Sequence, residues 1–250
     1  MLAILWQKRV DDTLYEVRSA GKTRRLYTNG VLHSQYNPNE VITGSVWDLL
    51  LLPALCVPEE NIKRILVLGV GGGAVLHQLN TLLSPDIQIG VELSAMHVMV
   101  AQQFFSLTQP NIVLHRADAV SWLTAYQGPK FDLIIDDLYG DENGEPVRTV
   151  PLTASWTEIL LSNLADDGVL VINTVSSEEL NGSHLVAGGV MEEHFSSAYR
   201  FATPRCHNAV GAFFKLPTTQ DVLRRRIITT PILEKAERKG LLQYTTKKLL

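Results

Sequence analysis

Short apolar runs alternate with segments of helical periodicity through the middle of the chain. The runs lie at residues 65–68, 87–91, 111–116 and 131–135. Runs this short, rich in branched residues and bounded by turn residues, predict strands that are buried on both faces. Helices are predicted between them at residues 74–83, 95–107 and 120–126. Strands that alternate with helices form a parallel sheet covered on both faces, so the pattern predicts a doubly wound α/β fold.

The chain before this alternation has a different pattern. Residues 13–17 and 23–36 are rich in Thr, Tyr, Val and Leu, and Asn29-Gly30 lies within the second run. Asn-Gly between two such runs is a strong hairpin signal, because both turn residues take positive φ. We therefore predict a small N-terminal β domain at residues 1–44. Ser45 followed by Asp48 is typical of a capping box, so a linking helix is expected to begin there and end near Pro53.

The chain after residue 137 begins with an acidic stretch that contains glycine. Residues 138–146 show neither helical nor strand periodicity, which fits a mobile loop over a pocket or an ordinary acidic surface loop. A helix is predicted next, at residues 153–164, and then a fifth strand at 168–174. A polar stretch at 175–181 leads to a second helix at 184–195, and two final strands follow at 198–202 and 209–216. A terminal antiparallel hairpin of this kind argues against a plain NAD domain, and the α/β domain is assigned to residues 45–217.

Residues 218–250 are basic and alternate apolar with charged positions at helical spacing. This pattern predicts a helical tail that packs on the body of the protein or on a second subunit.

Composition excludes several classes of function. With 46% hydrophobic residues and a net charge of −4, the chain is expected to be soluble. Two cysteines are too few for a secreted disulfide framework, so we expect a cytoplasmic location. The apolar run at residues 49–57 is too short to span a membrane. The basic first hairpin lacks interleaved aromatic residues, and the seven histidines lack zinc spacing, so neither a nucleic acid nor a metal is expected.

The first apolar run of the α/β pattern ends at a glycine-rich turn. Gly69, Gly71 and Gly73 let the backbone turn sharply and let a ligand approach the main chain closely. The spacing fits a dinucleotide and the nucleoside end of S-adenosylmethionine equally well. The turn therefore predicts a nucleotide-type site, and its ligand must be decided from the residues that follow.

Acidic residues follow the next two predicted strands. Glu92 lies about 20 residues after the glycine turn, where a carboxylate accepts both ribose hydroxyls in nucleotide-binding sheets. It is equally consistent with an ordinary acid at a strand end. Asp118, followed by the small Ala119, could bind an adenine amino group or act as a helix N-cap.

The fourth run ends in the adjacent carboxylates Asp136 and Asp137. Ligands of open α/β sheets bind at the carboxyl ends of the strands, so this pair is a candidate for chemistry. Successive side chains of a strand point to opposite faces, and only one of the two carboxylates can face the cleft.

These motifs together resemble the spermidine synthase family of polyamine aminopropyltransferases and the methyltransferase-like proteins related to it. The resemblance covers residues 13–215 and rests on Asn29-Gly30-Val31-Leu32-His33, Leu68-Gly69-Val70-Gly71-Gly72-Gly73, Val91-Glu92-Leu93, Ala117-Asp118-Ala119, Phe131-Asp132-Leu133-Ile134-Ile135-Asp136-Asp137 and Leu164-Ala165-Asp166-Asp167-Gly168-Val169-Leu170. It implies a seven-stranded Rossmann-like sheet of the class I methyltransferase type behind a small β domain, binding of S-adenosylmethionine or its decarboxylated form, and a homodimer.

The departures from the family pattern fall on the polyamine half of the site. Ala74 stands where the family has an aspartate that holds the aminopropyl end. Residues 43–45 replace a Tyr-His-Glu set, and His33 replaces a glutamine. The family's catalytic aspartate matches Asp137, whereas its polyamine-binding aspartate matches Gly140, with Asp141 one position away.

We therefore expect a transferase that uses an S-adenosyl donor and transfers an alkyl group, preferably methyl, to a small acceptor such as an amine. Aminopropyl transfer to a polyamine and non-catalytic nucleoside binding remain alternatives. Asp137 is the predicted catalytic residue. The predicted donor-binding residues are Gly69, Gly71, Gly73, Glu92, Leu93, Asp118, Ala119 and His33. The predicted acceptor-binding residues are Asp136, Tyr139 and Asp141.

Overall fold

The computed structural model describes residues 3–142 and 144–250. Its first part is an antiparallel sheet of four strands in the order β1 (Ala3–Val10), β2 (Thr13–Ala20), β3 (Thr23–Thr28) and β4 (Val31–Tyr36). Positive φ angles at Asn29 and Gly30 form the predicted hairpin turn. One face of the sheet packs on α3 (Ala95–Gln103), through Val17 and Leu26 against Val100. The sheet therefore has an apolar face covered by the larger part of the chain.

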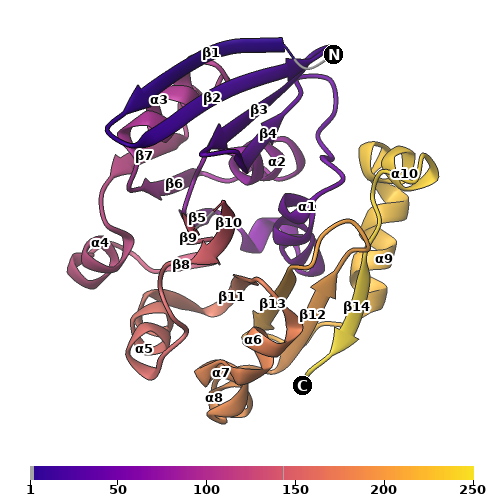
Figure 1. Ribbon diagram of the computed structural model, residues 1–250. Coiled ribbons are helices and arrows are strands. Elements are labelled where there is room, and N and C mark those ends of the chain that lie inside the picture. Colours follow the sequence, from indigo (N-terminus) through magenta and orange to yellow (C-terminus); the bar gives the residue numbers. More distant parts are fainter. Residues whose placement is uncertain (1–2, 143) are drawn as a thin grey trace.

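The second part is organised around a central sheet in the order β14-β12-β13-β11-β8-β5-β6-β7 (Figure 1). Its parallel members are β5 (Arg64–Leu68), β6 (Ile87–Glu92), β7 (Ile112–Arg116), β8 (Phe131–Asp136) and β11 (Leu164–Thr174). Antiparallel pairings add β13 (Ala209–Phe214), β12 (Ser197–Ala202) and β14 (Thr245–Lys248). The sheet thus has the predicted terminal hairpin, and the chain's last strand makes it eight-stranded rather than seven-stranded.

Helices cover both faces of this sheet. Successive residues of β5 point to opposite sides, with Ile65 and Val67 in one apolar cluster and Leu66 and Leu68 in the other. The first cluster lies under α1 (Val46–Leu51), the 3₁₀ helix η1 (Leu52–Cys56), α2 (Ala74–Leu82), α9 (Gln220–Thr229) and α10 (Pro231–Arg238). The second lies under α4 (Ala119–Ala125), α5 (Ala154–Asn163), α6 (Ser177–Gly182), α7 (His184–Ala187) and α8 (Val190–His194). A short 3₁₀ helix, η2 (Glu59–Asn61), precedes β5.

Several local predictions differ from the structure. The predicted loop at residues 138–146 contains a hairpin of β9 (Tyr139–Glu142) and β10 (Glu145–Arg148). The predicted helix at 184–195 is broken by Gly189, which has a φ of 76°, and the polar stretch before it forms α6. The start of α1 lacks the predicted side-chain cap from Ser45.

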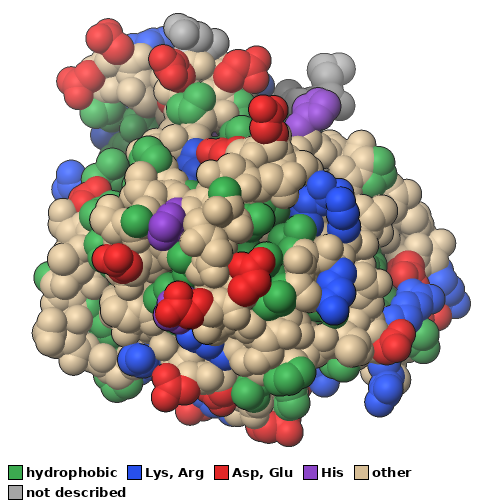
Figure 2. Space-filling view, turned by 90° about the horizontal axis from the view of Figure 1, so that it is seen from below, with side chains coloured by type: hydrophobic (Ala, Val, Ile, Leu, Met, Phe, Trp, Pro, Cys, Tyr) green, Lys and Arg blue, Asp and Glu red, His purple; other side chains and the backbone are tan. Residues whose placement is uncertain are grey.

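The C-terminal segment packs on the body of this same chain. Leu223, Ile227 and Leu233 are buried in the apolar cluster that also contains α1 and α2. Acidic and basic side chains are intermixed on the face of the molecule that Figure 2 shows. Among the described residues, each helix is too short or too polar to cross a bilayer.

Candidate functional site

The glycine turn after β5 lies where the carboxyl ends of the parallel strands meet the small sheet. Gly69 has a φ of 84°, and a Cβ built on it would lie 2.1 Å from the Asp137 carbonyl oxygen. Gly71 has a φ of 55°, and its Cβ would lie 2.6 Å from the His33 carbonyl oxygen. Any side chain at either position would push β8 or β4 away. Glycine is therefore needed here to bring three segments of the chain into contact.

Glu92, the last residue of β6, holds this turn with its carboxylate. Its Oε2 accepts hydrogen bonds from the Val70 and Gly71 N–H groups at 3.0 and 2.9 Å. Its Oε1 accepts one from the Ser94 N–H at 2.8 Å and lies 3.5 Å from His97 Nδ1. Burial opposes ionisation, but His97 and the backbone donors outweigh it and lower the pKa of Glu92. The carboxylate is therefore ionised and directed at the turn.

Two histidines lie beside Glu92. The ring of His97 also hydrogen-bonds through Nε2 to Thr28 Oγ1 at 2.8 Å, and its centroid is 5.1 Å from that of His33. Burial, followed by the neighbouring His97, lowers the pKa of His33 to about 4. The Nε2 of His33 is buried and has no hydrogen-bond partner among the described residues. His33 is thus a neutral ring with one free polar atom at the site.

The two adjacent carboxylates after β8 have different surroundings. Asp136 is fully buried, accepts a 2.8 Å hydrogen bond from Trp156 Nε1 and forms an ion pair with Arg148. It lines neither of the cavities described below, so the prediction that it contacts the acceptor is not supported by its position. Asp137 points the other way, towards the turn, and accepts a 2.7 Å hydrogen bond from Asn173 Nδ2.

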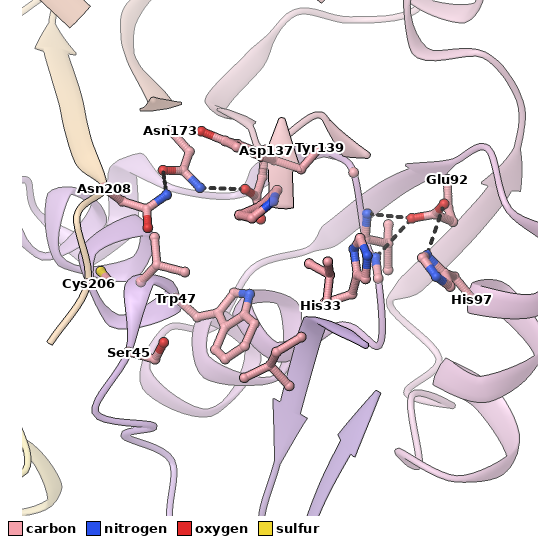
Figure 3. Close-up of a pocket in the computed structure, with 17 residues that line it drawn as sticks. His33, Ser45, Trp47, Glu92, His97, Asp137, Tyr139, Asn173, Cys206 and Asn208 are labelled. Atoms are coloured by element: carbon pink, nitrogen blue, oxygen red, sulfur yellow. Dashed lines mark hydrogen bonds and ion pairs between the residues drawn. The ribbon is translucent and has the colours of Figure 1, made fainter. Parts of the chain in front are cut away.

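The surroundings of Asp137 make it a weaker acid than usual. Burial is the main cause, and the nearby Asp136 adds to it, whereas Asn173 acts in the opposite direction; together they raise the pKa of Asp137 to about 6. Asn173 lies near the end of β11 and accepts a 3.0 Å hydrogen bond from Asn208 Nδ2. Figure 3 shows this chain of two amides leading to the carboxylate. Sequence reasoning missed both asparagines, although Asn173 is a polar residue in an apolar strand at the same sheet edge.

Two cavities meet at this edge of the sheet. The larger, of about 610 Å³, is lined by Glu92, Asp118 and residues of the small sheet. The smaller, of about 190 Å³, is lined by Asp137, Asn173 and residues of α1. The residues that line both are His33, Gly69, Glu92, His97 and Tyr139. The buried Tyr139 hydroxyl has no partner among the described residues, and burial raises its pKa, so it remains a free donor.

The other predicted site residues divide between the two cavities and the core. Leu93, Asp118, Ala119 and Asp141 line the larger cavity and Gly71 the smaller one. Asp118 also caps α4, accepting a 2.8 Å hydrogen bond from the Ser121 N–H. Gly73 lines neither cavity. Its Cβ would lie 2.5 Å from a Leu107 methyl carbon, so this glycine serves close packing at the start of α2 and is not placed against a ligand.

The polar groups that line the two cavities are spaced apart. Within residues 3–142 and 144–250, no group of three or more His, Cys, Asp or Glu side chains is arranged to hold a metal ion. A carboxylate near a glycine turn, a neutral imidazole and a phenol instead provide hydrogen bonds at separate points of two joined cavities.

Comparison of the sequence with known proteins gives one match to a family model and matches to individual proteins. A family model described as a methyltransferase domain matches residues 59–224. The polyamine aminopropyltransferase of Vibrio vulnificus is 29% identical over 159 residues, which are 62% of this chain and 46% of that protein. The spermidine synthase of Coffea arabica is 37% identical over 92 residues, 34% of this chain and 28% of that protein. The chain thus matches less than half the length of either relative.

Solved structures show the same fold at low sequence identity. A probable spermidine synthase from Corynebacterium glutamicum has a TM-score of 0.74 at 15% identity, covering 98% of this chain and 90% of that one. Human methyltransferase-like protein 13, solved with SAH, has a TM-score of 0.59 at 20% identity, covering 77% and 91%. Because the matched family model extends over most of the sequence, the protein belongs to the methyltransferase-domain family.

Proposed function

We propose that the protein is a transferase that binds an S-adenosyl donor and moves its alkyl group, a methyl group in the first instance, to a small amine acceptor. The observation that carries this proposal is the place of Asp137. Its carboxylate lies beside the glycine turn, and it lines the smaller of two cavities that meet there. The larger cavity can then hold the donor and the smaller one the acceptor, with the proton-accepting group in the acceptor cavity.

The larger cavity suits the nucleoside of the donor. Leu93, Asp118 and Ala119 line it together with Glu92 and His33. A carboxylate has about four lone-pair sites, and three of those of Glu92 are taken by backbone N–H groups. A ribose hydroxyl would take the remaining site, in competition with His97. The unpartnered His33 Nε2 and Tyr139 Oη are further free contacts for a polar ligand.

The acceptor chemistry belongs to Asp137. An S-adenosyl donor supplies an electrophilic carbon on a sulfonium: the amine lone pair forms the N–C bond while the S–C bond electrons go to sulfur, which leaves as a neutral thioether. The chain must orient the amine and accept its proton. The Asp137 carboxylate, fixed by the 2.7 Å hydrogen bond from Asn173, would do both. With a pKa of about 6, it is ionised at neutral pH yet basic enough to accept a proton.

Two alternatives are retained. The relatives named polyamine aminopropyltransferase and spermidine synthase support aminopropyl transfer from decarboxylated S-adenosylmethionine. Against it, Ala74 is buried at the start of α2, and Gly140 offers no carboxylate. The other alternative is a nucleoside-binding protein without turnover. It would bind the donor normally and transfer nothing to any amine.

Calorimetry tests the donor, because each candidate can be titrated separately. We expect binding of S-adenosylmethionine, its decarboxylated form or methylthioadenosine, and none of NAD. The reverse result would refute the proposal. Glu92→Ala should weaken donor binding by about 1.5–3 kcal/mol, the scale of a lost hydrogen bond to a charged group. Incubation with an amine panel then tests transfer. Rapid formation of spermidine from putrescine and decarboxylated donor would favour the aminopropyl alternative.

We further propose a cytoplasmic homodimer that interacts with neither nucleic acid nor membrane. The proposal for a dimer is supported by β1, an edge strand of the small sheet on which Ile4 and Leu5 are 56% and 49% exposed. Apolar side chains on an edge strand are commonly covered by another chain.

A further inference from the structure

The smaller cavity has one carboxylate that is free to bind a cation. Among the described residues its lining contains two acidic side chains, Glu92 and Asp137. The carboxylate oxygens of Glu92 are engaged by three backbone N–H groups and the His97 ring. Asp137 accepts one hydrogen bond from Asn173, which leaves most of its lone pairs available. Asp137 is therefore the group that would pair with an ammonium.

Apart from the paired Glu92 and His97, and from Asp137, the described residues of the lining include no acidic side chain and no basic side chain other than His33. No lysine or arginine of the described chain lines this cavity. Burial raises the pKa of the Cys206 thiol and that of the Tyr139 phenol, while the pKa of His33 is lowered to about 4. All three side chains are thus neutral at neutral pH.

The end of the cavity away from Glu92 combines apolar and neutral polar groups. Figure 3 shows Trp47, Ser45, Cys206 and Asn208 on that side, with Glu92 and His97 on the other. The Nδ2 of Asn208 is directed to Asn173, at 3.0 Å. An indole ring, a hydroxyl, a thiol and a carboxamide can pack against or hydrogen-bond a neutral group. They cannot neutralise a second ammonium or a carboxylate, and burying an unpaired charge costs several kcal/mol.

Size restricts the acceptor further. A cavity of about 150 Å³ holds a benzene molecule, and this one has about 190 Å³. It therefore has room for an amine of five to eight heavy atoms, on the order of a four-carbon chain or one ring.

We infer that the acceptor is a small monoamine whose far end carries no charge, with its nitrogen at Asp137 and its neutral end against Trp47, Ser45 and Asn208. This inference rests on the proposed transfer function and adds the class of acceptor. The Asp137 carboxylate first takes a proton from the bound ammonium. The nitrogen lone pair then forms the new bond to the donor carbon, the sulfur takes the electrons of the bond that breaks, and the product nitrogen is left as an ammonium.

A series of four amines of equal chain length tests the inference. Butylamine, 4-aminobutanol, 1,4-diaminobutane and 4-aminobutyrate share a chain of four carbons. The fourth carbon is a methyl group, bears a hydroxyl, bears an ammonium or is a carboxylate. With S-adenosylmethionine as donor, we expect kcat/KM for butylamine and aminobutanol to be at least tenfold higher than for the other two. A preference for diaminobutane or aminobutyrate would overturn the inference.

Binding measurements separate failure of the inference from failure of the proposed transfer. The four amines are titrated into the protein saturated with methylthioadenosine. If butylamine binds more tightly than diaminobutane but no amine reacts, the acceptor class stands and the transfer proposal fails. If butylamine neither reacts nor binds, the inference itself is overturned.

A single substitution can reverse the preference. Ser45 is the N-cap residue of α1, and both Asp and Asn are favourable at such a position. Ser45→Asp adds a carboxylate at the neutral end, and it should raise the ratio of diaminobutane to butylamine kcat/KM at least tenfold. Ser45→Asn changes the side chain without the charge and should leave that ratio within twofold. An unchanged ratio in Ser45→Asp would overturn the assignment of this cavity to the acceptor.

Discussion

Asp137 is the proposed proton acceptor, and its substitution by asparagine tests that role. In Asp137→Asn the amide oxygen still accepts the hydrogen bond from Asn173, but the side chain cannot accept a proton. We expect kcat to fall by a factor on the order of a hundred to ten thousand, the usual contribution of a general base. Donor affinity measured by calorimetry should stay within twofold. A variant that retains most of its activity would exclude Asp137 as the base.

The pH dependence of both properties follows from the raised pKa. In the proposed reaction the Asp137 carboxylate must be ionised, so kcat/KM should fall as pH drops below about 6. The folded-state pKa is above the ordinary aspartate value of 3.8, so folding favours the protonated side chain. This contribution is fully present below about pH 4 and lost as pH rises through 6. Chemical denaturation should show Asp137→Asn more stable than wild type at pH 8, by about 2 kcal/mol, and equal to it near pH 4.

At the residue scale the sequence predicts strand-end positions but not the partners of the side chains. Periodicity places Glu92 and Asp137 at the carboxyl ends of two parallel strands, β6 and β8, which lie on either side of β5. Strand alternation requires Asp136 and Asp137 to face opposite ways. Which of the two carboxylates faces the cavity depends on Trp156 and Arg148, which lie 20 and 12 residues further along the chain. Partners of this kind are brought together by the fold, and no local sequence motif predicts them.

Gly69, at the start of the glycine turn, packs against the residue that follows β8. A Cβ at Gly69 would meet the Asp137 carbonyl carbon and oxygen, both backbone atoms that cannot move aside without shifting β8. Gly21 has a similarly positive φ of 58°, but a Cβ there would meet nothing within 4 Å. Gly21→Ala should therefore lose about 1–2 kcal/mol, the cost of the left-handed backbone alone.

Gly69→Ala should lose clearly more stability than Gly21→Ala, because it adds a steric clash to the same backbone cost. It should also reduce donor affinity, since Gly69 lines both cavities and the residues that follow β8, Asp137 and Leu138, each line one. Urea denaturation and calorimetry measure the two effects. Equal losses of stability in the two variants would contradict the contact at Gly69.

The hairpin of β9 and β10 is an element that the sequence did not predict. Its strands, Tyr-Gly-Asp-Glu and Glu-Pro-Val-Arg, contain residues that are depleted in strands, and its turn includes residue 143, which lies outside the described residues. Tertiary contacts hold it instead. Arg148 pairs with Asp136 and donates a 2.8 Å hydrogen bond to the Asn173 carbonyl oxygen. Whether the hairpin becomes better ordered when donor binds remains a prediction for hydrogen exchange.

Removal of Arg148 should release this hairpin. Arg148→Met leaves Asp136 charged, buried and without its ion pair, which we expect to reduce the free energy of unfolding by about 3–5 kcal/mol. Amide exchange in residues 139–148 should accelerate more than in β5. The double variant Asp136→Asn/Arg148→Met removes both charges and should recover much of the lost stability. If the double variant is less stable than the single one, the ion pair is not what holds the hairpin.

At the scale of the whole molecule, the C-terminal segment is part of the main core, although its basic composition suggests a separate tail. Helical spacing predicted the α9 and α10 region, and their apolar residues complete the cluster formed by α1, α2 and the sheet. The sequence of β14, Thr-Thr-Lys-Lys, shows no alternation of apolar and polar residues. It is an edge strand, and three of its four residues are exposed. Its pairing with β12 depends on main-chain hydrogen bonds, which periodicity cannot predict.

The prediction of a homodimer depends on the small sheet. Its inner face is covered by α3, but β1 is an edge strand on which Ile4 and Leu5 remain about half exposed. Covering the exposed half of each side chain at a two-fold interface would add about 1 kcal/mol per side chain, roughly half of the value for full burial. We therefore expect a dimer in sedimentation at micromolar concentration, and a monomer for Leu5→Glu, which places a charge in that interface. Val222 on α9 is 37% exposed and distant in sequence, so Val222→Glu should leave the dimer intact. Wild-type protein that sediments only as a monomer would show that these side chains of β1 are not covered by a second copy of the chain.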